Sequence, residues 1–172
     1  MTTDPKREAR LVLQAQSGDR DALELVLCNI QASLFRYISG VVGRSRAEDV
    51  LQEVFLKICR DLKWLREPEL FRPWTYRIAS RESFALLKRE RRWANPNGET
   101  VDECSAPPDP WMPELFSEVP EILERISPGS RAVLLLHYVQ DLQIAEVAAI
   151  LDINIGTAKS RLAYGVSCLR KQ

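Results

Sequence analysis

Histidine and paired cysteines are scarce in this sequence, which restricts the chemistry that the protein can perform. The chain of 172 residues has one histidine, His137, and four cysteines, none in a Cys-x-x-Cys pair. A zinc site needs about four clustered nitrogen or sulfur ligands, so we expect no metal site. Cys28 and Cys59 are expected to be small core residues in a reducing compartment. Because no nucleophile–base set, P-loop or carboxylate pair is found, we predict a binding protein, not an enzyme, without a cofactor.

Long apolar runs and strand-like patterns are also missing. The N-terminal residues 1–8 are polar and do not resemble a signal peptide, and no apolar run approaches the roughly 18 residues that span a membrane. We therefore expect a cytoplasmic protein without membrane insertion. Aromatic residues make up only 8% of the sequence, whereas Leu, Ala, Glu and Arg dominate. This composition favours an all-α fold.

The formal net charge is zero, which at first argues against binding to nucleic acid. The charges are nevertheless segregated along the chain. Residues 1–93 hold 18 Lys and Arg against 13 Asp and Glu, residues 94–127 hold one against eight, and residues 128–172 hold five against three. Two basic blocks therefore flank an acidic segment, and the local field governs binding to a polyanion more than the total charge does.

Helix signals divide the chain into two parts. In the first part they predict helices over residues 5–16, from 19 to breaks at Gly40 and Gly43, over 47–58 with Ser45 as a cap, and over 71–93. In the second part they predict helices over residues 121–126, from Ser127-Pro128 through Tyr138, over 143–151 and over 155–169. Six of the ten prolines fall between the two parts. We predict two small helical domains, residues 1–93 and 121–172, joined by a flexible acidic linker, residues 94–120.

The helix over 47–58 carries two different stripes at helical spacing. One is apolar and predicts the buried face: Ala47, Val50, Leu51, Val54, Phe55 and Ile58. The other is polar with one leucine: Asp49, Gln52, Glu53 and Leu56. This second stripe is either a solvated face with one stray leucine, which is common, or a binding face for a partner protein.

The helix over 71–93 interleaves aromatic rings with cations. The candidates for contacts to nucleic acid are Trp74, Arg77, Arg81, Lys88, Arg89, Arg91 and Arg92. Cations hold phosphates, and aromatic rings stack on unpaired bases. The alternative is an amphipathic helix with its aromatic residues in the core and its arginines solvated, which accounts for part of this pattern.

Residues 143–151 and 155–169 form two short helical segments joined by a turn, as in a helix-turn-helix. The predicted buried stripe of the second helix is Ile155, Ala158, Leu162, Val166 and Leu169. The residues expected on its outer face are Thr157, Ser160, Arg161 and Tyr164, with Lys159 at the margin, and all of them can donate to phosphates or base edges. The alternative is any antiparallel helix pair with a polar outer face, because its buried and exposed residues recur at the same spacing.

Three segments in this order resemble the extracytoplasmic-function (ECF) sigma factors of the bacterial sigma-70 family. They are Ala47-Glu-Asp-Val-Leu-Gln-Glu-Val-Phe-Leu-Lys-Ile58, Phe71-Arg-Pro-Trp-Thr-Tyr-Arg-Ile-Ala79 with Leu87-Lys-Arg-Glu-Arg-Arg92, and Asp141–Leu151 with Gly156-Thr-Ala-Lys-Ser-Arg-Leu162. The resemblance implies a region 2 bundle in residues 1–93, which binds core RNA polymerase and reads and melts the −10 element. It implies a region 4 helix-turn-helix in residues 121–172, which reads the −35 element.

The resemblance also assigns partners to particular residues. Asp49, Gln52 and Glu53, with Leu56 beside them, occupy the face that meets the clamp helices of the largest polymerase subunit, and the polymerase flap is a further implied contact. Thr157, Lys159, Ser160 and Arg161 match the part of the recognition helix that enters the −35 major groove. An anti-sigma factor is a further implied partner.

Three positions depart from the family pattern. Relatives carry Ala-Arg-Asn-x-x-x-Asp where this chain has Ala79-Ser-Arg-Glu-Ser-Phe-Ala85, which suggests a divergent member with unusual promoter preference. Asp152 stands where a turn glycine is common, and aspartate tolerates a left-handed backbone better than most residues.

Two alternative functions are a helix-turn-helix regulator independent of core polymerase, and a sigma-like adaptor that sequesters an anti-sigma factor.

Overall fold

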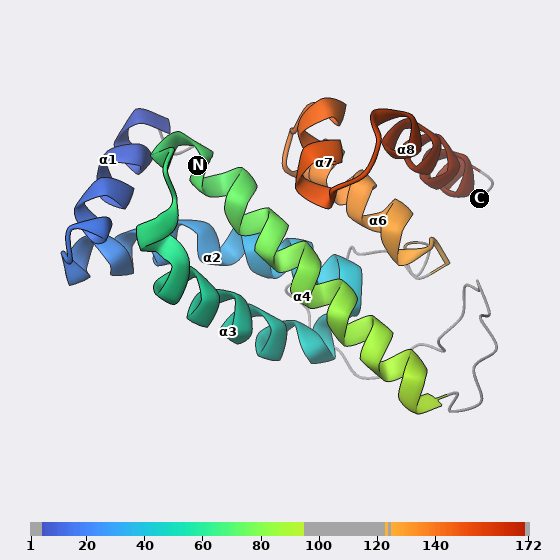
Figure 1. Cartoon of the computed structure of the whole chain (residues 1–172). Coiled ribbons are helices and arrows are strands. Elements are labelled where there is room, and N and C mark those ends of the chain that lie inside the picture. Colours follow the sequence, from blue (N-terminus) through green and yellow to red (C-terminus); the bar gives the residue numbers. More distant parts are fainter. Residues whose placement is uncertain (1–4, 95–122, 124, 171–172) are drawn as a thin grey trace.

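The computed structural model describes residues 5–94, 123 and 125–170, and every regular element in these residues is a helix (Figure 1). The elements are α1 Pro5–Gln16, α2 Arg20–Val42, α3 Arg44–Asp61, η1 Leu62–Trp64, η2 Pro68–Leu70, α4 Phe71–Ala94, α6 Pro128–Leu134, the π-helical η3 Leu135–Val139, α7 Ile144–Leu151 and α8 Ile155–Arg170. The all-α prediction is confirmed. The predicted helix over 121–126 lies largely outside the described residues.

Local signals set most helix ends. Asp19 caps α2, because its carboxylate accepts hydrogen bonds from the backbone N–H groups of Asp21 and Ala22 at 3.0 and 3.1 Å, which are otherwise unpaired in the first turn. Gly43, at φ 85°, ends α2 and directly precedes α3. The predicted cap at Ser45 is therefore wrong, since α3 already begins at Arg44.

The predicted break at Gly40 is wrong as well. Helix α2 continues through Gly40 and ends only at Val42. A Cβ at this position would lie 2.5 Å from Cδ1 of Leu135. The glycine therefore serves a close approach between α2 and η3, and it does not interrupt the helix.

The core of the N-terminal part lies between α2, α3 and α4. The predicted apolar stripe of α3 faces inward: Ala47, Val50, Leu51, Val54 and Ile58 are buried, and Phe55 is half-buried. Tyr37 of α2 and Tyr76 of α4 meet edge to face, with ring centroids 5.5 Å apart. The hydroxyl groups of Tyr37 and Ser80 lie 2.7 Å apart, and burial raises the pKa of Tyr37 above its usual range.

Both expected core cysteines are exposed. The helical period explains the error: Val26 and Ile30 of α2 point into the core and are fully buried, so Cys28, between them, points outward. Ile58 of α3 is fully buried, which leaves Cys59, one residue further along the helix, on the outer side.

Helix α2 is also long and apolar enough to cross a membrane by length and composition, contrary to the sequence-based expectation. Of its most apolar window, 44% is buried in the protein. Its inward residues include Val26, Ile30 and Leu34, all fully buried. A core helix therefore accounts for this apolar character.

Helices α6 and η3 pack on α2, and α7 packs on α4, whereas α8 packs on α6 and α7 (Figure 1). Their buried residues Ala132, Val133, Leu135, Leu136, Val147 and Ile150 join the same hydrophobic cluster as α2, α3 and α4. The two parts of the chain thus share one continuous core in this structure.

Candidate polymerase and nucleic-acid interfaces

The outer face of α3 presents the predicted polar stripe to solvent. Asp49, Gln52 and Glu53 are exposed, and the Leu56 side chain among them is 59% exposed. The nearby cation Lys57 points elsewhere, because its Nζ donates to Glu82 of α4 at 2.6 Å. The stripe is therefore acidic around one apolar side chain, a combination that suits a partner with cationic and apolar groups.

Helix α4 carries the predicted cationic surface. Arg81, Lys88, Arg89, Arg91 and Arg92 are exposed, whereas Trp74 and Arg77 are half-buried. The acids Glu82 and Glu90 pair with Lys57 and Arg46 of α3, each at 2.6 Å. Within the described part of the chain, the acids of α4 are thus paired with α3 and do not balance the cations at its C-terminal end.

The two tryptophans of α4, Trp74 and Trp93, differ in how far they are buried. Trp74 packs on Phe71, with ring centroids 6.3 Å apart, so part of its ring belongs to the core. Trp93, at the end of α4, is 83% exposed. Trp93 ends the dense basic run from Lys88, which favours contact with nucleic acid. It is not among the predicted site residues, because apolar periodicity alone does not separate an exposed ring from a core ring.

The helix-turn-helix geometry is present in α7 and α8. Asp152 adopts the left-handed conformation at φ 56°, as expected for the residue in place of a turn glycine. Helix α7 begins with a capping box in which the Gln143 backbone N–H donates to the Glu146 carboxylate at 2.8 Å. The capping box fixes the start of α7, and the left-handed Asp152, whose backbone N–H donates to the carbonyls of Ala148 and Ala149, forms the turn into α8.

The outer residues of α8 are placed largely as predicted. Thr157, Lys159, Ser160 and Tyr164 are exposed. Arg161 is half-buried, and its guanidinium lies over the first turn of α6: a Cβ on Gly129 would be 3.1 Å from its Nη1. Its side chain is therefore held in place by α6.

The predicted buried stripe of α8 is wrong at both ends. Ile155 and Leu169 are 49% and 38% exposed. Ala158 and Gly165 are the buried residues, and a Cβ on Gly165 would lie 2.5 Å from Cδ1 of Leu134. The helices α6 and α8 therefore approach most closely near Gly165, and the ends of α8 leave the core.

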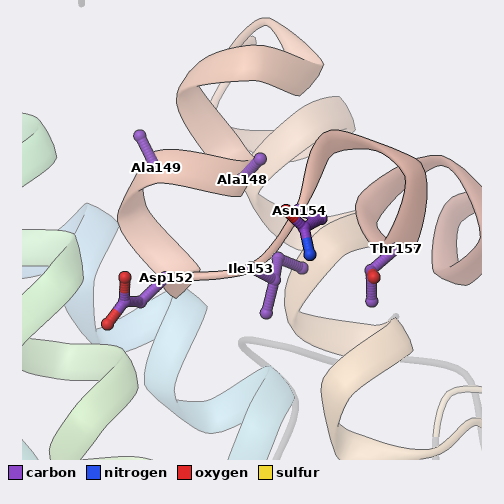
Figure 2. Close-up of a pocket in the computed structure, with 6 residues that line it drawn as sticks. All are labelled: Ala148, Ala149, Asp152, Ile153, Asn154 and Thr157. Carbon is purple, nitrogen blue, oxygen red and sulfur yellow. The ribbon is translucent and has the colours of Figure 1, made fainter.

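An open hollow of about 470 Å³ lies at the turn between α7 and α8 (Figure 2). Its lining residues are Ala148, Ala149, Asp152, Ile153, Asn154 and Thr157. The first turn of α8 borders it, and the free backbone N–H groups of a helix start favour phosphate. The negative charge of the Asp152 carboxylate disfavours an anion there. This carboxylate lies 3.9 Å from Nη2 of Arg77 in α4.

His137, the only histidine of the sequence, makes contacts that are structural. Nδ1 of His137 donates to the Leu142 carbonyl at 2.8 Å, and the ring packs on Tyr138. In the described part of the chain, no three His, Cys, Asp or Glu residues are grouped so that they could hold a metal ion.

Known protein families match both parts of the chain. The model of sigma-70 region 2 matches residues 30–93, and the model of sigma-70 region 4 matches residues 116–169. The first match contains α3 and α4 with their two surfaces, and the second contains the helix-turn-helix. The chain therefore belongs to the sigma-70 family, as an RNA polymerase sigma factor.

Individual relatives define the group within that family. The chain is 25% identical to the ECF RNA polymerase sigma factor SigW of Bacillus subtilis (strain 168), over 94% of each protein. It is 28% identical to the ECF RNA polymerase sigma-E factor of Escherichia coli (strain K12), over 88% of this chain and 86% of that protein. It is an ECF sigma factor.

Solved structures share the fold. The sigma factor RpoE in complex with the anti-sigma factor NepR, from Bartonella quintana, aligns with a TM-score of 0.68 over 86% of this chain and 94% of that one, at 19% identity. CnrH in complex with the cytosolic domain of CnrY aligns with a TM-score of 0.63 over 98% of this chain and 96% of that one, also at 19% identity.

Proposed function

We propose that this sigma factor works through three separate surfaces, one for core polymerase and two for promoter DNA. The observation that carries the proposal is the exposed stripe Asp49, Gln52, Glu53 and Leu56 on α3, opposite the buried stripe of the same helix. Figure 1 shows α3 well apart from α7 and α8. Polymerase can therefore hold the stripe while other helices meet DNA.

The polymerase contact is assigned to the clamp helices of the largest subunit. An acidic stripe that ends in an exposed leucine matches the anatomy of a specific interface, which combines an apolar contact with charges that select the partner. A second contact, to the polymerase flap, is assigned to the C-terminal unit.

The −10 element is assigned to α4. Its exposed cations Arg81, Lys88, Arg89, Arg91 and Arg92 suit the phosphates of a melted strand, and Trp74 and Arg77 complete the set at its N-terminal half. The exposed ring of Trp93 adds a stacking surface for an unpaired base. Arg81 and Ala85 are both exposed, so the departures from the family pattern face the DNA and alter which −10 sequence is preferred.

The −35 element is assigned to Thr157, Lys159, Ser160, Arg161 and Tyr164 of α8. A recognition helix places residues near its N-terminus against base edges in the major groove, and neighbouring residues against phosphates. Thr157 borders the hollow at the α7–α8 turn, where a phosphate of the same duplex can meet the helix start.

These roles divide the chain into region 2 over residues 1–93, an acidic linker over 94–120 and region 4 over 121–172. Sigma factors bind and position polymerase and DNA and are not enzymes, which agrees with the absence of a catalytic set in the sequence. We place the chain in the cytoplasm, where polymerase and promoter DNA are found. By analogy with the two solved relatives in their complexes, an anti-sigma factor is a further partner.

Run-off transcription with core polymerase tests the proposal. We expect promoter-specific transcripts from genomic fragments only when the purified chain is added. A chain that binds duplex DNA but not core polymerase would instead be an independent helix-turn-helix regulator. A chain that binds an anti-sigma factor and yields no promoter-specific transcript would be an adaptor.

A further inference from the structure

Helix α4 carries two acids along its cationic surface, Glu82 and Glu90. Glu82 follows Arg81 directly, in the segment where this chain departs from the family pattern. An unpaired carboxylate at this place would repel the phosphates that α4 is assigned to bind. The counterion of Glu82 therefore affects how well α4 can hold DNA.

That counterion is Lys57 of α3. Its Nζ donates to Oε1 of Glu82 at 2.6 Å. The side chains of Lys57 and Glu82 are 34% and 22% exposed, so water and salt screen this pair less than a pair in open solvent. The negative charge of Glu82 is thus neutralised from outside α4.

Within α4, no cation lies one helical turn from Glu82. Side chains three or four residues apart face one another on a helix, and at these distances from Glu82 stand only the uncharged Ile78, Ala79, Ala85 and Leu86. Arg81 is the adjacent residue, and adjacent side chains on a helix point in different directions. Glu82 therefore takes its counterion from α3.

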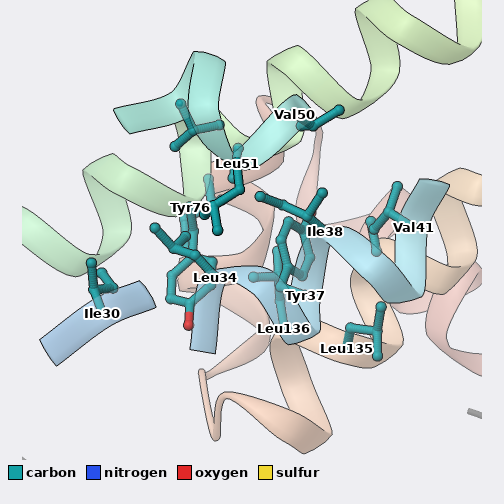
Figure 3. Packing of buried hydrophobic residues seen from close by; sticks show 14 of the residues in the cluster. Ile30, Leu34, Tyr37, Ile38, Val41, Val50, Leu51, Tyr76, Leu135 and Leu136 are labelled. Atoms are coloured by element: carbon teal, nitrogen blue, oxygen red, sulfur yellow. The ribbon is translucent and has the colours of Figure 1, made fainter. Parts of the chain in front are cut away.

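The core packs α3 against α4 independently of this pair. Val50 and Leu51 of α3 and Tyr76 of α4 are buried in the same cluster, together with side chains of α2 (Figure 3). Lys57 and Glu82 are only half-buried, and ion pairs in such positions contribute little to stability. The consequence of the pair is therefore larger for the charge of the surface than for the fold.

We propose that Lys57 is a positioning residue for the −10 element, which holds the Glu82 carboxylate against α3 and keeps the surface around Arg81 positive. Lys57 acts through Glu82 and needs no contact of its own with DNA. It lies one turn after Glu53, so the helix that presents the polymerase stripe also conditions the DNA surface. This inference rests on the proposed function, because it assumes that α4 binds the −10 element.

Removal of the cation, of the acid and of both tests this role. The affinity of the polymerase–sigma complex is measured for a promoter fragment whose −10 element is single-stranded on the nontemplate strand. We expect Lys57→Met to weaken binding about fivefold, the size of the repulsion between unit charges about 8 Å apart at an effective dielectric constant of about 40. Glu82→Gln should bind at least as tightly as the wild type, and Lys57→Met/Glu82→Gln should recover the wild-type affinity.

The double variant separates charge from structure. It still lacks the ion pair, so a merely structural role of the pair would leave its affinity as low as that of Lys57→Met. Arg60→Met is the matched control, because it removes a cation of α3 whose partner, at 2.7 Å, is Asp61 of the same helix. Wild-type affinity in Lys57→Met, absence of rescue by Glu82→Gln, or an equal loss in Arg60→Met would overturn the proposal.

Two measurements keep this inference apart from the proposed function. The affinity of Lys57→Met for core polymerase should equal that of the wild type, and a loss that accounts for the weaker DNA binding would overturn the proposal by placing Lys57 in the polymerase interface. On heparin, a polyanion, Lys57→Met without polymerase should elute at lower salt than Arg60→Met, although each variant loses one positive charge. Equal elution would contradict the neutralisation of Glu82. A wild-type complex that does not bind the −10 fragment would refute the proposed function, while the heparin comparison would still decide the role of Lys57.

Discussion

Leu56 distinguishes the outer face of α3 from an ordinary solvated helix surface. Its side chain is 59% exposed, and burial of a leucine in an interface contributes about 1.5–3 kcal/mol. A single exposed leucine is common, but Gln52 and Glu53 flank this one at helical spacing. Asp49 lies one turn further along the same face, so the partner can meet all four residues at once.

We predict that Asp49→Ala or Gln52→Ala weakens binding to core polymerase about five- to tenfold, which corresponds to about 1 kcal/mol or slightly more. Both side chains are exposed, so the circular dichroism spectrum and the melting temperature should be unchanged. The affinity is measured by fluorescence anisotropy, with the exposed Glu24→Ala on α2 as the matched control. Normal affinity in both α3 variants would refute the assignment.

We predict that Arg161→Ala lowers the affinity for −35 DNA by about 1–3 kcal/mol if the guanidinium reads a base edge. Arg161→Lys retains the charge but not the paired donors, and Arg170→Ala at the end of α8 is the control. Competition between the −35 element and scrambled duplexes measures the effect. An equal loss on both would show that Arg161 holds a phosphate and reads no base.

Tyr37 supplies a prediction for alkaline pH. Burial raises the pKa of Tyr37 in the folded protein above its ordinary value of 10.0, because the interior disfavours the phenolate. The unfolded chain loses the Tyr37 proton at a lower pH than the folded protein does. The contribution of Tyr37 to the free energy of unfolding is therefore complete below pH 10.0 and decreases as pH rises above it. We expect urea unfolding to show a smaller alkaline loss of stability in Tyr37→Phe than in the wild type. Parallel pH profiles would contradict this role of burial.

Helix α4 combines a structural inner side with a cationic end. Ala79, Ser80 and Ser83 are buried, whereas Lys88, Arg89, Arg91 and Arg92 are exposed. The pairs Lys57–Glu82 and Arg46–Glu90 attach α4 to α3. Among the residues that the structure describes, these pairs occupy the acids of α4 with α3 and not with the cations at the end of α4.

We predict that replacing these four cations with alanine lowers the salt dependence of promoter binding by the polymerase–sigma complex. Each lost phosphate contact reduces the slope of log K against log salt by about 0.7–0.9, so loss of all four contacts changes it by up to about 3.6. Filter binding across a salt series measures the slope. The double variant Arg7→Ala/Arg10→Ala on α1 is the control, and an unchanged slope in the α4 variant would remove this helix end from the DNA interface.

Helix positions were predictable from the sequence where local chemistry decides them. The Asp19 cap, the Ser127-Pro128 start and the left-handed Asp152 all depend on groups within a few residues, and all three occur. Gly40 was not predictable, because the residue that requires it, Leu135, is distant in sequence. Arg161 was predicted on the outer face, but it is half-buried against Gly129, and this contact depends on how α6 crosses α8.

One continuous core lies beneath the two units of the molecule, of which the first is assigned to polymerase and the −10 element and the second to the −35 element. The segregation of charge explains how a chain of zero net charge serves DNA, because the net negative charge lies in residues 94–127, between two blocks of net positive charge. The buried residues of α6 and η3 extend the core of α2, α3 and α4. The division into three segments, with its linker over 94–120, remains a prediction from sequence.

Periodicity, caps and motif order in the sequence alone determined the helical class, the inner and outer faces of α3, and the ordered pattern of an ECF sigma factor. These features depend on contacts between near neighbours in the chain, which a 3.6-residue repeat displays directly. Only the tertiary structure decided that Gly40 admits Leu135, that Arg131 caps α2, and that Ile155 and Leu169 are exposed. Each depends on how distant helices cross, and the crossing is set by packing of the whole core, which no local pattern encodes.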